Sequence, residues 1–246
     1  MTDEQRKAEE YAGTLEGLLG DALVSVVLYG SVARGEHRTG RSDINLLVIV
    51  NELGIGELRA IASSVREWVA AGNPPPMMLS IEEWTGSADV FALEYSDIRD
   101  AHVVLAGRDP VQGMPIRREH LRLQVEREFR SKKIQLREGY LATGDSPEDL
   151  GSLLAQSLST FLTLFRALLR LAGETVPRST PDLIEAAAAQ VGFTADPVLE
   201  IHRARTSGTP PTAGIKSPLA AAYLEVVERC VVWLDAYSPD GFGEEV

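Results

Sequence analysis

Two short apolar runs, joined through a small turn and a polar stretch, constrain the fold of this chain more than any other feature. The first run lies within residues 22–29 and ends at Gly30-Ser31, and the second, residues 44–50, follows Asp43 directly. Runs of this length that are rich in Val, Ile and Leu indicate buried strands. The sequence therefore predicts two strands, with polar residues where the first ends and where the second begins.

The pair Gly30-Ser31 forms a turn that is suited to an anion. Glycine allows the chain to turn tightly, and Ser31 can cap a short helix that begins at Val32. Amides at the start of a helix lack intrahelical partners and favour negative charge, so they can bind a triphosphate. A Gly-Ser pair alone is common, and a plain strand-to-helix cap is the alternative.

Asp43 and Asn45 are candidate metal ligands at the start of the second strand. Because they are two residues apart, both side chains project from one face of the strand while Ile44 faces the core. Magnesium prefers hard oxygen ligands, with one or two carboxylates beside phosphate oxygens and water. Two such ions can hold the attacking and leaving oxygens of an in-line displacement.

Glu94 is the candidate third carboxylate, which usually comes from a neighbouring strand. Residues 91–96 alternate in the manner of a strand, and Glu94 then shares a face with the small side chains of Ala92 and Ser96. Asp97 is a weaker substitute because it would alternate onto the opposite face. An exposed acid on an edge strand is the alternative interpretation of Glu94.

The remaining patterns divide the chain near residue 113. The first part alternates helical and strand-like segments: helices at 3–19 and 56–71, a strand at 77–79, a brief helix at 81–84 and an edge strand at 103–105. After it the strand signals vanish. A helix with a salt-bridged face of Arg and Glu is expected at 116–141. A second is expected at 148–172 and is apolar enough to be buried on most sides. Three more helices are expected to begin near Pro181, Pro197 and Pro218. Thr180 and Asp196 are the expected caps of the first two of these.

Composition narrows the class of partner. The chain has 246 residues and a formal net charge of −12, which disfavours nucleic acid, because nucleic-acid binders need a positive surface. A cationic small molecule or a protein is the better match for such a chain. The single cysteine excludes an intramolecular disulfide, and the start of the chain has no secretory signal. No run of 18 apolar residues is available to span a membrane, so a cytoplasmic protein is expected.

The residues Gly30-Ser31, Ala33-Arg34-Gly35 and Ser42-Asp43-Ile44-Asn45-Leu46-Leu47-Val48 resemble the signature of the DNA polymerase β-type nucleotidyltransferase superfamily. The closest branch is that of the minimal and antibiotic nucleotidyltransferases, with a helical C-terminal domain. The resemblance implies an α+β fold, with a small mixed sheet and flanking helices in residues 1–112. A helical bundle would follow in residues 113–246.

The same resemblance implies an enzyme that moves a nucleoside monophosphate from a nucleoside triphosphate to a hydroxyl group. ATP is the expected nucleoside triphosphate. Mg²⁺ is the implied cofactor, with Mn²⁺ as a substitute. The residues carried over are, as catalytic groups, Asp43 and Glu94; as metal ligands, Asp43, Asn45 and Glu94; and as nucleotide contacts, Gly30, Ser31, Arg34 and Ser42.

Asn45 departs from the pattern, which has an acid at this position. An amide oxygen can bind a metal but carries no net charge, so metal affinity should fall. Slow catalysis, catalysis with one tightly held metal, and nucleotide binding without turnover all remain open.

The acceptor is expected to be an aminoglycoside-like cationic compound or a protein hydroxyl. The alternative is a weakly active or inactive nucleotide-binding regulator, including an antitoxin-like role with a partner protein. The resemblance also leaves a homodimer open.

Overall fold

The computed structural model of the chain describes residues 2–35, 43–143, 146–209, 211, 213 and 217–237. The chain divides into two compact units, Met1–Ile116 and Arg117–Val246, and each is described by itself. The boundary expected from the sequence, after residue 112, lies close to this division.

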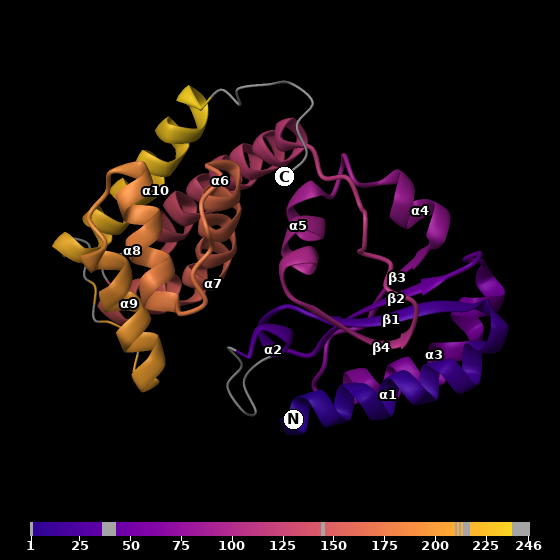
Figure 1. Cartoon of the computed structure of the whole chain (residues 1–246). Coiled ribbons are helices and arrows are strands. Elements are labelled where there is room, and N and C mark those ends of the chain that lie inside the picture. Colours follow the sequence, from indigo (N-terminus) through magenta and orange to yellow (C-terminus); the bar gives the residue numbers. More distant parts are fainter. Residues whose placement is uncertain are drawn as a thin grey trace. The chain divides into compact units, whose positions relative to one another are not determined.

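The first unit is built on a four-stranded sheet with the order β3-β2-β1-β4 (Figure 1). The strands are β1 (Leu23–Tyr29), β2 (Asn45–Val50), β3 (Met77–Ser80) and β4 (His102–Gly107). β1 is antiparallel to both β2 and β4, whereas β2 is parallel to β3. The sheet is therefore mixed, and β4 is an edge strand, as the sequence predicted.

Two layers of helix cover the sheet. Figure 1 shows α1 (Asp3–Leu19) and α3 (Ile55–Ala70) on one face, and α4 (Ile81–Gly86) and α5 (Ala92–Asp100) on the other. The core on the first face includes the rings of Tyr11 and Trp68, which stack with centroids 4.2 Å apart. The predicted helices at 3–19 and 56–71 are confirmed to within a residue, because their apolar stripes are long and regular.

Alternation along the central strands decides which side chains reach the α4–α5 face. Ile44 and the even-numbered residues of β2 belong to the core with α1 and α3, as do Val26 and Leu28 of β1. Since side chains alternate across a strand, Asn45 and Tyr29 point to the other face. The two are direct partners in the β1–β2 ladder, so they lie side by side at one end of the sheet.

The strand predicted at 91–96 is wrong: these residues open the helix α5. Its buried positions are Ala92, Leu93, Tyr95, Ser96 and Ile98, which recur at helical spacing. A short apolar run of this kind fits a strand or a buried helix equally well on periodicity alone. Tertiary packing decides for the helix, since the Tyr95 ring packs against the Trp84 ring at a tilt of 34°, with centroids 4.0 Å apart. Glu94 is therefore an exposed residue on a helix.

The second unit is entirely helical in its described part. It contains α6 (Arg118–Thr143), α7 (Pro147–Leu171), α8 (Thr180–Val191), α9 (Asp196–Ser207) and α10 (Pro218–Ala236). These bounds confirm the predicted helices. Two helix caps differ from the prediction. α8 is capped by Ser179 and not by Thr180. α9 follows Ala195 without a side-chain cap, whereas Asp196 was expected to cap it.

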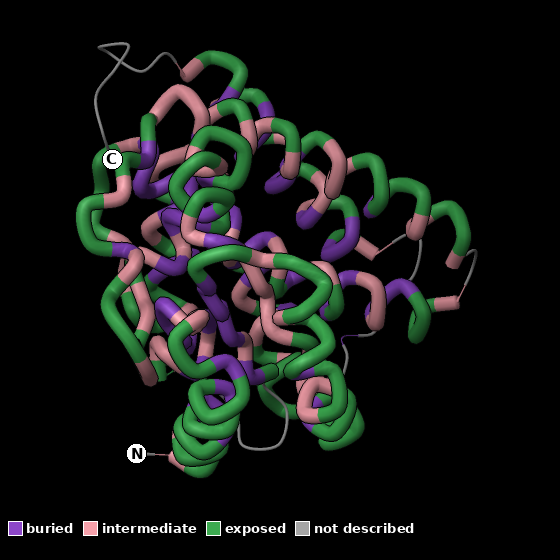
Figure 2. The backbone as a smooth tube through the Cα atoms, turned by 90° about the vertical axis from the view of Figure 1, so that its right-hand side faces the viewer, coloured by how far each residue is buried: buried purple, intermediate pink, exposed green. Residues whose placement is uncertain are grey.

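α7 is the central helix of this unit. It packs against α6, α8 and α9, and more than half of its residues are buried. Figure 2 shows the contrast between buried stretches and the exposed faces of the outer helices. By length and composition alone α7 could also cross a membrane. Its packing against three helices explains this apolar composition, which is typical of a buried core helix.

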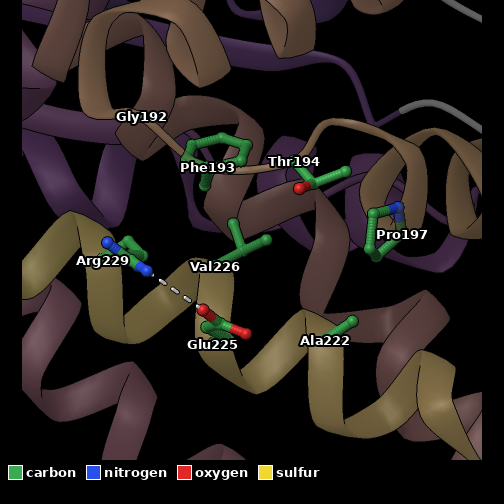
Figure 3. A pocket seen from close by; sticks show the side chains of 8 residues that line it. All are labelled: Gly192, Phe193, Thr194, Pro197, Ala222, Glu225, Val226 and Arg229. Atoms are coloured by element: carbon green, nitrogen blue, oxygen red, sulfur yellow. Dashed lines mark hydrogen bonds and ion pairs between the residues drawn. The ribbon is translucent and has the colours of Figure 1, made fainter.

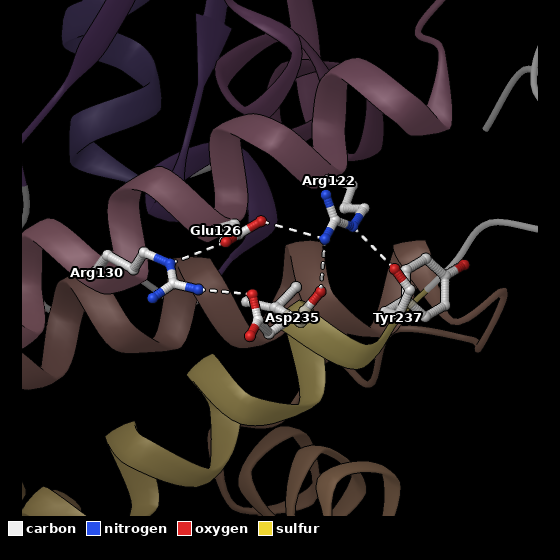
Figure 4. A network of polar contacts seen from close by, with 6 residues as sticks. Arg122, Glu126, Arg130, Asp235 and Tyr237 are labelled. Carbon is white, nitrogen blue, oxygen red and sulfur yellow. Dashed lines mark hydrogen bonds and ion pairs between the residues drawn. The ribbon is translucent and has the colours of Figure 1, made fainter.

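A polar seam joins α6 to the end of α10 (Figure 4). Arg122 donates from Nε to the carbonyl of Tyr237 at 2.9 Å and from Nη2 to the carbonyl of Leu234 at 3.1 Å. Arg130 bridges Glu126 at 2.8 Å and Asp235 at 2.7 Å. The predicted salt-bridged face of α6 is confirmed, and Arg122 supplies the positive charge that a helix C-terminus favours.

Gly107 provides a test of the β1–β4 register. Its φ is +75°, and a Cβ there would lie 2.1 Å from the carbonyl oxygen of Val24. Gly107→Ala is expected to lower the free energy of unfolding by about 3 kcal/mol, because the backbone would have to move and the φ is unfavourable. Urea denaturation measures the change. Gly13→Ala is the control, since a Cβ at Gly13 meets nothing within 4 Å; equal stability of the two variants would contradict the register.

Candidate functional site

The turn after β1 is tight and leads into a short helix, as the sequence predicted. The predicted cap is wrong, because Ser31 is the first residue of the helix and the cap position is Gly30, without a side-chain hydrogen bond. Gly30 has φ 80° and ψ −151°, and it leads into α2 (Ser31–Arg34), a helix of four residues that ends at Gly35 with φ 75°. Both glycines occupy the positive-φ region that other residues rarely adopt. The amide of Arg34 donates to the Gly30 carbonyl at 3.0 Å, which closes the single helical turn.

Asn45 lies directly against this turn. A Cβ at Gly30 would come within 3.0 Å of the Asn45 Nδ2. Two features therefore favour glycine at position 30: its positive φ, and the Asn45 carboxamide, which leaves little room for a side chain. The structure thus brings position 45 next to the Gly30-Ser31 turn, as the expected site requires.

Asp43 precedes the buried Ile44 and is exposed, so its carboxylate is accessible at the start of β2. Ile44 is only 3% exposed and belongs to the core with α1 and α3. Asp43 and Asn45 therefore flank a residue that anchors the strand, which agrees with the alternation predicted from the sequence.

The acid that contacts the motif turn is Asp97, which the sequence ranked below Glu94. Arg34 donates from Nη1 and Nη2 to the two oxygens of Asp97 at 3.1 and 3.2 Å. The side chains of Arg34 and Asp97 are 15% and 14% exposed. The pair ties α2 to α5, and the helical structure of 92–100 is what turns Asp97 toward the turn.

Glu94 lies one helical turn before Asp97, and the charges of both acids affect the pKa of Tyr29 at the end of β1. Burial raises the pKa of the Tyr29 phenol, and the negative charges of Asp97 and Glu94 raise it further. Tyr29 is also the ladder partner of Asn45. The acidic face of α5 is therefore close to the residues that the motif contributes.

Two hollows of the helical unit are lined by residues that do not belong to the motif. One, of about 110 Å³, lies between the α8–α9 connection and α10; Arg229 and Glu225, 3.3 Å apart, form an ion pair beside it (Figure 3). The other, of about 230 Å³, lies between α6 and α7, with Lys132 and Gln156 among its lining residues. Neither contains the carboxylates needed for a metal site.

The family model of the nucleotidyltransferase domain matches residues 8–110. This chain carries a nucleotidyltransferase domain. The match includes the whole sheet, the Gly30-Ser31 turn and the Asp43–Asn45 segment, so the resemblance to the DNA polymerase β-type superfamily is confirmed. A comparison with curated proteins finds no significant match.

A solved structure shares the fold over nearly the whole chain. Spectinomycin adenyltransferase AAD(9) from Enterococcus faecialis, crystallised with ATP and spectinomycin, aligns with a TM-score of 0.57 and 12% sequence identity. The alignment covers 92% of this chain and 98% of that chain. The expected α+β fold, a nucleotidyltransferase domain followed by helices, is therefore confirmed.

The donor atoms of the nucleotidyltransferase domain fit a divalent cation only in part. Within the described ranges, three or more His, Cys, Asp or Glu side chains do not gather in a group that could hold a metal. Asp43 and Asn45 offer one carboxylate and one amide oxygen, which are the hard ligands that Mg²⁺ accepts beside phosphate oxygens. This set fits a cation that arrives with a nucleotide. Ser42, the remaining predicted contact, lies outside the described residues.

Proposed function

We propose that this chain transfers a nucleoside monophosphate from ATP to a hydroxyl of a small cationic molecule, with pyrophosphate as the leaving group. The observation that carries the proposal is the meeting of the Gly30 turn, Asn45 and the acidic face of α5 at one end of the sheet in a nucleotidyltransferase domain. The shared fold with an adenyltransferase crystallised with ATP and spectinomycin supports the choice of both substrates.

Each residue has a role that follows from its position. The amides of the turn at Gly30 and Ser31 receive phosphate oxygens, because they start a helix at the end of a buried strand. Asp43 and Asn45 hold Mg²⁺, which when bound supplies positive charge to the phosphates. Glu94, exposed on α5 near Tyr29, accepts the proton of the acceptor hydroxyl.

The charge of the chain supports a cationic acceptor. The net charge of −12 attracts cations over long range, and Glu94 and Asp97 add negative potential close to the turn. Aminoglycoside-like compounds combine several ammonium groups with hydroxyl groups, so they meet both requirements. A hydroxyl group on a partner protein is the rival acceptor.

Asn45 favours a second candidate function, nucleotide binding without transfer. The motif then supplies one formal negative charge, from Asp43, and the predicted third carboxylate, Glu94, lies on a helix rather than on a neighbouring strand. A site with less charge holds its metal more weakly. A chain of this kind would act as a nucleotide-dependent regulator or as an antitoxin-like partner of another protein.

Transfer of label from ATP tests the proposal. The purified chain is incubated with Mg²⁺, α-labelled ATP and a panel that contains spectinomycin, aminoglycosides and a cell extract as a source of protein acceptors. We expect label on a cationic small molecule, and none with Asp43→Asn. Nucleotide binding with no labelled product on any acceptor would overturn transfer and support the second candidate.

A further inference from the structure

α2 is too short to hold its own conformation. It has four residues between two glycines with positive φ, and Val32 is its one buried residue. Isolated helices of this length are unstable in water, because a single turn fixes several dihedral angles for very few hydrogen bonds. Tertiary contacts must therefore fix the direction of the amides that start the helix.

The Arg34–Asp97 pair provides such a contact on the polar side of α2. Both N–H···O distances, 3.1 and 3.2 Å, describe a fork in which two nitrogens meet two oxygens. This geometry restricts orientation as well as distance, which a lysine at position 34 would not do. The side chains are about 85% shielded from solvent, so the pair is screened less than a surface ion pair.

The same ion pair also reduces the repulsion between two acidic residues of α5. Glu94 and Asp97 are three residues apart on this helix, and like charges at this spacing repel each other. The guanidinium of Arg34 offsets the charge of Asp97. The bonds to Asp97 use two of the five N–H donors of Arg34, so this role stands beside the triphosphate contact expected from the sequence, which stays a prediction.

We propose that Asp97 is a positioning residue: through Arg34 it holds the Gly30-Ser31 turn in the arrangement that receives phosphate. This inference rests on the proposed function for its consequence in nucleotide binding. The positioning itself is a property of the nucleotide-free chain. The two can therefore be measured separately.

The test compares Asp97→Asn with the control Asp89→Asn, which removes the same charge from an exposed position of the same unit. Amide hydrogen exchange is followed at residues 31–35 without nucleotide, and Mg-ATP affinity is measured by calorimetry. In Asp97→Asn we expect exchange about tenfold faster and ATP binding about tenfold weaker, within the usual range of coupling between contacting residues. Asp89→Asn should match the unmodified chain in both.

Further variants separate positioning from misfolding. Arg34→Gln should accelerate exchange at residues 31–35 as much as Asp97→Asn does, and combining the two should add little. Asp97→Glu keeps a carboxylate and should restore part of the protection. Thermal unfolding of each variant establishes that it is folded.

Two results would overturn the inference: unchanged exchange at residues 31–35 in Asp97→Asn, or tighter ATP binding by it. The second would mean that Asp97 competes with phosphate for Arg34. If the unmodified chain binds no ATP, the proposed function fails, while faster exchange in Asp97→Asn would still support the positioning role.

Discussion

Replacing Asp43 with asparagine is expected to weaken Mg-ATP binding about 100-fold and to abolish nucleotidyl transfer. Asp43 is the one carboxylate that the Asp43–Asn45 segment offers to a divalent cation, and asparagine keeps its size while removing its charge. A unit charge near a divalent cation is worth several kcal/mol even at an effective dielectric constant of about 20, and exposure reduces this. A loss of 100-fold corresponds to about 2.7 kcal/mol.

Calorimetric titration of Mg-ATP measures this loss, and Asp89→Asn is the matched control. Adding EDTA to the unmodified chain should bring its ATP affinity down to that of the variant, because both changes remove the metal contribution. Asp43 is exposed, so the thermal stability of the variant should be unchanged. Equal affinities for the variant and the unmodified chain would exclude Asp43 as a metal ligand.

Asn45→Asp is expected to strengthen Mg-ATP binding at least about tenfold, because it adds the second acid that the motif normally has. Aspartate and asparagine have nearly the same shape, so the close fit against Gly30, where a Cβ would lie 3.0 Å from the Asn45 Nδ2, is kept. The rate of label transfer should rise as well if metal binding limits it.

A second readout for Asn45→Asp is the midpoint of thermal unfolding with and without Mg²⁺. In the absence of metal the new carboxylate repels Asp43, so the variant should unfold at a slightly lower temperature. Added Mg²⁺ should then stabilise the variant more than the unmodified chain, because a ligand that binds the folded state raises its stability. Identical affinity for Mg-ATP in both proteins would remove position 45 from the metal site.

Local patterns were sufficient to predict most of the fold. β1 and β2 have continuous apolar runs, and α1 and α3 have long regular stripes, so their type and position follow from the residues themselves. The Gly30-Ser31 turn and the alternation around Ile44 likewise depend only on neighbouring residues in the sequence. This is why the end of the sheet that holds Gly30, Asp43 and Asn45 was predicted correctly.

The contribution of α5 could not be predicted in the same way. Residues 91–96 fit two periodicities, and only packing of Tyr95 on Trp84 selects the helix. The Arg34–Asp97 pair joins residues 63 positions apart, a tertiary contact with no local signature. The spacing of the buried residues Ala92, Tyr95 and Ile98 is helical, but residues 91–96 alone are too few to distinguish a helix from a strand.

The central claim is that a divalent cation and a triphosphate bind together beside the turn at Gly30. A crystal structure grown with Mn²⁺ and a non-hydrolysable ATP analogue tests it most directly, because Mn²⁺ gives an anomalous signal. We expect a Mn²⁺ peak at about 2.0–2.3 Å from a carboxylate oxygen of Asp43, with phosphate oxygens at the Gly30-Ser31 amides. Metal and phosphates bound elsewhere, with Asp43 free of metal, would contradict the account.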